Sequence, residues 1–243
     1  MTKHKLLLLC LLSLASCAKQ EQPVAKTESP TPKSERGPDG KKYPTANEKD
    51  LKGIVRTRFD SPNPTAAQLA RRMKNNKTIR EMGLPVLETL PVVEDESMAK
   101  LRSPKEIAER CIATSFCAVR CETKDQKFVD SLIKDYSADT FFSPEEKRFL
   151  RDPNPSQQTL TNFSWRYECV HVFLWAMDSR SSLSRPNEIC PVSEDVKLIR
   201  NAGPAHFVAA AKRRPPAEIL DMADYYYRLH WAAVELRING KKS

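Results

Sequence analysis

The stretch that decides the fold is residues 158–178, QTLTNFSWRYECVHVFLWAMD. Its apolar side chains recur every three or four positions, which is the period of a helix with one buried stripe. These side chains are Leu160, Phe163, Tyr167, Val170, Leu174 and Met177. Further large residues, among them Trp165 and Phe173, cover much of the remaining surface of the cylinder. A helix that is apolar on most sides is buried on most sides, so we expect a central helix over about residues 158–178.

Helix start signals recur on both sides of this stretch. The sequences SPKE (103–106) and SPEE (143–146) are capping boxes with proline at the first helical position. Together with Thr65, Gly83 and Pro215-Pro216, they predict helices over about residues 66–82, 103–121, 125–136, 147–151, 193–201, 204–213 and 215–238. Six glycines in 243 residues leave few turn formers for a many-hairpin β architecture. We expect an all-α fold, a single domain of about seven helices spanning residues 54–240, packed around the central helix and the long C-terminal helix.

The N-terminus is typical of an export signal. Lys3 and Lys5 precede an apolar run, residues 6–14, that is too short to span a bilayer. The run ends in Leu14-Ala15-Ser16-Cys17, which resembles the lipobox of bacterial lipoproteins. In that class the signal is cleaved before the cysteine, whose thiol receives a diacylglyceryl group. We therefore expect a signal peptide over residues 1–16 and a membrane anchor on Cys17.

Residues 17–53 are predicted to be a disordered tether. They are rich in Pro, Lys, Glu and Thr and carry hardly any large apolar side chains, so they cannot bury enough surface to offset their ordering entropy. Their charges have both signs, which is not typical of a nucleic-acid arm. Ala18 follows the lipidated cysteine, where an aspartate favours retention in the inner membrane of Gram-negative bacteria. In such a cell we expect the outer membrane, with the protein facing the periplasm.

Two stretches near the C-terminal half resemble a known family. One is WRYE (165–168) followed by HVFLWA (171–176), and the other is RPPAEILD (214–221) followed by DYYYRLHWA (224–232). With Leu84-Pro85 and the helix start at 103–110, they are similar to the bacterial family catalogued as domain of unknown function 4272, over about residues 54–240. The resemblance implies a helical domain and does not imply an activity.

The central helix carries one polar pair that could serve a site. Glu168 and His171 lie three residues apart and therefore share a face, whereas Arg166 lies nearly opposite. Carboxylate-bridged di-metal bundles use such a pair in two copies with further glutamates, and this chain has one copy. The alternatives are a metal site, a small polar ligand pocket, and a buried carboxylate bonded to another helix. The last is favoured, because an unpaired buried carboxylate is costly.

The last predicted helix carries a charged stripe. Asp221, Asp224 and Arg228 fall along one side of it, and the last two are spaced i, i+4. This stripe predicts a face directed toward solvent or toward another helix. His230 lies on the other side, in line with apolar residues, where a histidine is usually a satisfied core residue. A catalytic or proton-sensing histidine is the alternative.

Five cysteines remain after the expected cleavage site and Cys17. They are Cys111, Cys117, Cys121, Cys169 and Cys190. An exported chain can keep disulfides, and the pairing is open; a bridge through Cys190, which precedes Pro191 in a predicted loop, is the favoured one. There is no C-x-x-C spacing, so we do not expect structural zinc.

No catalytic motif stands out. The sequence has no G-x-S-x-G, no glycine-rich phosphate loop and no cysteine with an evident histidine partner. We expect a non-enzymatic envelope lipoprotein that needs no cofactor. Its expected partners are the membrane, through Cys17, and an envelope protein or, given the net charge of +9, an anionic envelope polymer. Nucleic acid is a poor partner for an exported protein.

Two alternatives to this expectation remain. In one, the protein is a hydrolase or metal-dependent enzyme using Glu168, His171 and His230, which would have to converge in one pocket. In the other, the polar groups of the domain are purely structural.

Overall fold

The computed structural model describes residues 34–36, 42–44, 64–183 and 186–239. The predicted signal peptide, Cys17 and most of the predicted tether lie outside these residues. The helices are α3 (Ala66–Glu81), α4 (Pro104–Thr123), α5 (Gln126–Asp135), α6 (Pro144–Arg151), α7 (Gln157–Ser164), α8 (Arg166–Ala176), α9 (Val192–Ala209) and α10 (Pro216–Ile238). Residues 64–183 and 186–239 contain no strand, so the all-α prediction is confirmed.

One pair of strands precedes the helical domain. β1 (Ser34–Arg36) pairs with β2 (Lys42–Pro44) in antiparallel register, with Glu35 opposite Tyr43. An isolated two-stranded ribbon of this length is at best marginally stable in water. The ribbon therefore does not change the fold class.

The predicted capping boxes are confirmed. Ser103 accepts a hydrogen bond from the Glu106 N–H at the start of α4, and Ser143 accepts one from the Glu146 N–H at the start of α6. Thr65 forms a third capping box with Gln68, at the start of α3. Each box satisfies backbone N–H groups that a helix leaves unpaired at its first turn. These local signals explain why the helix starts could be predicted from the sequence.

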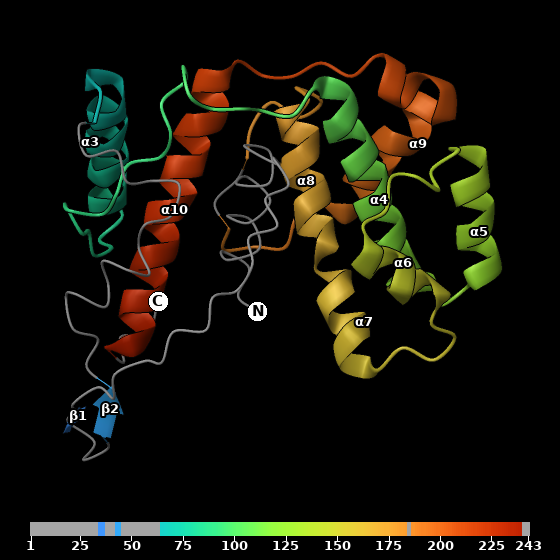
Figure 1. Ribbon diagram of the computed structural model, residues 1–243, viewed down its shortest axis with the longest axis horizontal. Coiled ribbons are helices and arrows are strands. Elements are labelled where there is room, and N and C mark those ends of the chain that lie inside the picture. Colours follow the sequence, from blue (N-terminus) through green and yellow to red (C-terminus); the bar gives the residue numbers. More distant parts are fainter. Residues whose placement is uncertain (1–33, 37–41, 45–63, 184–185, 240–243) are drawn as a thin grey trace, which may run out of the picture.

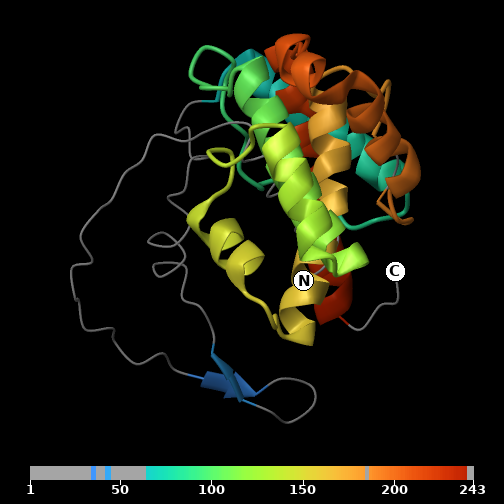
Figure 2. The same cartoon turned by 90° about the vertical axis from the view of Figure 1, so that its right-hand side faces the viewer.

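The centre of the domain is α8, which packs along α4 (Figures 1 and 2). Every residue from Tyr167 to Ala176 is buried, so the prediction of a helix buried on most sides is confirmed. α4 has thirteen buried residues, ten of which belong to the same apolar core. The shorter helices α5, α6 and α7 and the longer α9 surround this pair.

The single helix predicted over 158–178 is divided into α7 and α8 at Trp165. Trp165 has φ −64° and ψ −7°, a turn of tighter geometry, and its carbonyl accepts from the Glu168 N–H at 3.1 Å. α7 is rich in Thr, Asn and Ser, whose side chains compete for backbone groups; Ser164 Oγ donates to the Thr161 carbonyl at 2.8 Å. The apolar period indicates which side chains are buried in both helices, but it does not indicate this bend.

The other end of the molecule is built by α3 and α10, which lie side by side (Figure 1). α10 joins the common apolar core through residues such as Ile219, Ala223 and Leu229. Arg214, just before α10, donates to the carbonyl oxygens of Trp175 (2.7 Å) and Arg180 (2.6 Å). It thereby ties the start of α10 to the end of α8.

α9 is bent at Gly203, which has φ +71°, a conformation open to glycine, and is followed by Pro204. The bend separates the two helices predicted over 193–201 and 204–213. No helix in the described part of the chain combines the length and apolarity needed to cross a bilayer.

Candidate functional site

The polar residues singled out from the sequence fall into separate clusters. Those of α8 and those of α10 each have partners of their own among the described residues, as the following contacts show. Cys17 lies outside the described residues, so the structure does not bear on its lipidation.

Asp224 and Arg228 lie at the interface between α10 and α3. Asp224 is fully buried and accepts two hydrogen bonds from Arg228, both of 2.8 Å. Asn75 of α3 donates to the same carboxylate at 2.9 Å. Arg228 is 3 % exposed, so this ion pair is removed from water, and the Arg228 Nη1 atom has no hydrogen-bond partner among the described residues. The charged stripe of α10 therefore faces another helix rather than solvent at this point.

Asp221 lies at the edge of the same interface. Its carboxylate accepts from Arg71 Nε at 2.7 Å and from Lys74 Nζ at 2.9 Å, both on α3. Burial works to raise the pKa of this carboxyl, but the two cations outweigh burial and hold the pKa below its ordinary value. Asp221 thus adds a partly exposed ion-pair cluster to the buried one.

The extended segment 84–102 is held against this interface by backbone contacts. Arg228 donates to the Pro91 carbonyl at 3.2 Å, and Gln68 donates to the Val93 carbonyl at 2.7 Å. Polar side chains of α3 and α10 therefore fix a segment that has no regular secondary structure of its own.

Glu168 is buried, at 3 % exposure, and accepts a hydrogen bond of 3.0 Å from the backbone N–H of Cys190. The favoured interpretation was a buried carboxylate bonded to another helix; the carboxylate is buried and has a donor, but this donor lies in the loop before α9. Tyr226 of α10 lies within electrostatic reach of Glu168. Burial, followed by Tyr225 and Glu168, raises the pKa of the Tyr226 hydroxyl well above its ordinary value.

His171 has a different partner from Glu168. Its Nδ1 lies 2.8 Å from Oδ2 of Asp195, a fully buried residue of α9. The other oxygen of Asp195 accepts from Arg180 Nε at 2.7 Å, and Arg180 also donates to Glu194 at 2.9 Å. This chain of charges and hydrogen bonds ties α8 to α9 and fixes the orientation of the imidazole.

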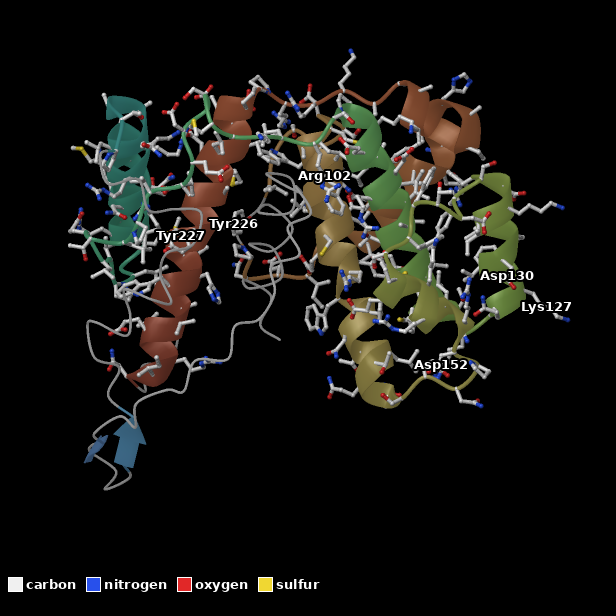
Figure 3. The ribbon with its side chains drawn as sticks, in the orientation of Figure 1. Arg102, Lys127, Asp130, Asp152, Tyr226 and Tyr227 are labelled. Carbon is white, nitrogen blue, oxygen red and sulfur yellow. The ribbon has the colours of Figure 1, made fainter. Side chains whose placement is uncertain are left out.

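Arg166 and His230 lie apart from these pairs. The Arg166 guanidinium lies over the Phe163 ring, 5.1 Å from its centroid, and 3.9 Å from Glu145. His230 is half-buried and follows Tyr226 by one turn of α10, away from the Asp224 side. Tyr226 and Tyr227 are labelled on α10 in Figure 3.

An ion pair that the sequence did not predict joins Arg110 of α4 to Glu146 of α6. Arg110 donates to both oxygens of the nearly inaccessible Glu146, at 2.9 and 2.7 Å. Burial works against ionisation, but Arg110 and the bond from Ser143 outweigh it and hold the pKa of Glu146 below its ordinary value. The capping box predicted the bond to Ser143; nothing in the chain spacing pointed to Arg110.

Cysteine chemistry among the described residues is limited to a disulfide at Cys169, and metal binding gains no support from them. The bridged cysteine is Cys169 of α8 and not Cys190, so the favoured bridge is wrong. Burial raises the pKa of Cys121 to about 11, and it also raises those of Cys111 and Cys117 well above their ordinary value. Such thiols hold little of the reactive thiolate near neutral pH. Within residues 64–183 and 186–239, no three His, Cys, Asp or Glu side chains are placed to hold a metal ion.

An open cavity of about 670 Å³ lies between α5 and α6, and we call it the α5–α6 groove. Its lining includes Asp130 and Lys134 of α5, Asp139 of the connecting turn, and Lys147 and Arg151 of α6. None of the residues singled out from the sequence lines it. A second cavity, of about 430 Å³, lies between α9 and the turn after α8, with a lining that includes Met177 and Phe207.

Comparison with known proteins gives one match. No curated protein and no solved structure matches the chain. The family model described as "Domain of unknown function (DUF4272)" matches residues 71–243, from the middle of α3 through α10. This range contains the central helix, the Arg110–Glu146 pair and the α5–α6 groove. The chain belongs to this family of domains of unknown function.

Proposed function

We propose that the protein is a lipoprotein of the bacterial envelope whose helical domain binds another envelope component without catalysing a reaction. The observation that carries the proposal is the sequence Leu14-Ala15-Ser16-Cys17, placed directly after a cationic start and a short apolar run. Cleavage before Cys17 and attachment of a diacylglyceryl group would leave the domain tethered to a membrane.

The burial of acyl chains in a bilayer explains why such an anchor would be stable. Each buried methylene contributes about 0.8 kcal/mol, so two or three acyl chains hold a protein stably where one chain does not. With Ala18 after the cysteine, the proposed location in a Gram-negative cell is the periplasmic face of the outer membrane.

The contacts within the domain favour binding over catalysis. The buried ionisable side chains have structural partners: Asp224 with Arg228, Glu146 with Arg110, and His171 with Asp195. Each pair joins elements of the fold or fixes a side chain, and each would lose stability if it gave up its partner to a substrate. The α5–α6 groove, in contrast, is open and charged.

The net charge supports an envelope partner. Cleavage before Cys17 removes Lys3 and Lys5 and lowers the formal charge from +9 to +7. A basic domain held close to a membrane meets anionic lipids, anionic polymers and acidic proteins at high local concentration.

The test is recovery of tagged full-length protein from native membranes after crosslinking, with the Cys17→Ala variant as control. We expect the wild type in the membrane fraction, a mature N-terminus carrying a diacylglyceryl group by mass spectrometry, and a stoichiometric partner that the control loses. An unlipidated, soluble wild type would overturn the anchor. Lipidated protein that yields no partner would overturn the binding role, and metal analysis and substrate screening would then be directed to Glu168 and His171.

A further inference from the structure

The α5–α6 groove has the size and the floor of a ligand site. Its volume of about 670 Å³ lies within the range of about 300–1,000 Å³ that ligand clefts occupy. Phe142 and Leu150 form an apolar floor and are themselves nearly inaccessible, at 7 and 8 % exposure. A ligand could therefore bury an apolar side chain against a fixed surface.

Three cations line the groove. Lys147 and Arg151 lie one turn apart on α6, and Lys134 faces them from α5. Like charges four residues apart on a helix repel each other. Among the described residues, none of the three has a carboxylate within ion-pair distance, whereas Arg110 on the neighbouring α4 is paired with Glu146. An acidic group in the groove would relieve this repulsion.

The groove also contains groups that a uniformly negative polymer would not match. Asp139 and Asp130 place two carboxylates in the lining, and Asp130 accepts a hydrogen bond of 2.7 Å from Gln126. The hydroxyl groups of Ser137 and Thr140 lie in the same lining. Carboxylates, an amide and hydroxyls suit the N–H and C=O groups of a peptide backbone, whereas the carboxylates repel a polyphosphate or an anionic lipid surface.

We propose that the α5–α6 groove binds an acidic peptide segment of a partner protein. Acidic side chains of the segment pair with Lys134, Lys147 and Arg151, an apolar side chain packs on Phe142, and the backbone bonds to the polar rim. The assignment rests on the proposed binding function and names its site and partner class. Asp130 of the groove and Tyr226 of α10 lie on opposite sides of the helical domain in Figure 3.

The test uses the full-length protein in detergent and three fluorescent ten-residue peptides. The peptides differ in one residue type, which alternates with leucine and serine: glutamate in the first peptide, glutamine in the second and lysine in the third. Fluorescence anisotropy measures their binding to the wild type and to a Lys147→Gln, Arg151→Gln double variant, which keeps helix-forming residues in α6. Lys100→Gln, an exposed lysine in the extended segment 84–102, is the matched control. Circular dichroism verifies that each variant is folded.

We expect the glutamate peptide to bind at least ten times more tightly than the other two, and the double variant to lose most of this preference while Lys100→Gln keeps it. Raising the salt concentration should weaken the binding. Equal binding of the three peptides, or equal binding by wild type and double variant, would overturn the proposal.

Polyphosphate and anionic vesicles serve as competing probes. If they bind at Lys147 and Arg151 more tightly than the glutamate peptide does, the partner is a polyanion and the peptide assignment is wrong. If no probe binds while native membranes still yield a partner, the groove assignment fails and the proposed binding function stands.

Discussion

The α4–α8 pair and the α3–α10 pair are both helix–helix interfaces, but they are built from opposite kinds of residue. α8 is buried along its length, and it packs on α4, whose buried residues are mostly apolar. α3 buries four polar side chains and one apolar side chain, Ile79. The first interface is held by the hydrophobic effect, which is non-directional. The second is held by hydrogen bonds and charges that require particular partners.

The difference has consequences for stability. Truncation of a side chain in an apolar interface leaves a cavity, and the loss in the free energy of unfolding grows with the volume of that cavity. A buried ion pair contributes little net stability, but removal of one partner leaves an uncompensated charge. The α3–α10 interface should therefore be the more sensitive of the two to single substitutions, although α3 buries a single apolar side chain.

The largest expected effect is that of Asp224→Ala. The substitution leaves Arg228 buried without its carboxylate and Asn75 without its acceptor, so we expect a loss of about 3–5 kcal/mol in the free energy of unfolding. Urea unfolding followed by circular dichroism measures it. The double variant Asp224→Ala, Arg228→Met should recover part of the loss, because it removes the stranded charge as well. A double variant as unstable as the single one would contradict this account.

In the apolar interface, Leu174→Ala should cost about 3 kcal/mol, because the fully buried side chain leaves a cavity behind. Chemical unfolding gives the value, and Leu198→Ala at the surface of α9 serves as control. A loss at Leu174 as small as that of the control would show that α8 is not the centre of the core.

The same kind of substitution, removal of an N-cap hydroxyl, can be made in one helix of each interface. Ser103→Ala at α4 and Thr65→Ala at α3 each remove a side chain that accepts from the first turn, and each should cost about 1 kcal/mol. Amide hydrogen exchange then reports whether the loss stays local. We expect faster exchange throughout α3 in Thr65→Ala, and exchange confined to the first turn of α4 in Ser103→Ala. Equal behaviour of the two helices would contradict the proposed difference.

The smallest effect is a pH dependence at the edge of the α3 interface. Hydrogen bonds from the Thr65 hydroxyl and from Ser97 lower the pKa of Asp95 to about 2, from 3.8. Because the folded pKa is the lower one, the stabilisation is present above about pH 4 and is lost as the pH falls through 2. A carboxyl titration by NMR checks the value, with Asp95→Asn to identify the signal. A pKa of Asp95 near 4 would show that these bonds are absent in solution.

Much of the fold could be predicted because its signals are local. Capping boxes act over three residues, and the apolar period of α8 acts over one turn, so both can be recognised along the chain. The break at Trp165 escaped prediction because the apolar period continues through it. It depends on weak competition from the Thr, Asn and Ser side chains of α7.

The polar contacts could be predicted in type but not in partner. The stripe of α10 predicted a charged face, yet the bond between Asn75 and Asp224 spans 149 residues of the chain. Glu146 was recognised as a cap, whereas its partner Arg110 lies on another helix. The α5–α6 groove left no signal, since its charges become neighbours through the packing of α5 and α6.

The most direct test of the central claim separates the buried polar groups from the groove. Partner recovery from native membranes would be compared among the wild type, Glu168→Gln, and the Lys147→Gln, Arg151→Gln variant. The account predicts that Glu168→Gln retains the partner, because its amide oxygen can still accept from Cys190, and that the groove variant loses it. Loss of the partner in Glu168→Gln, with full recovery in a folded groove variant, would contradict the account and move the binding site to α8.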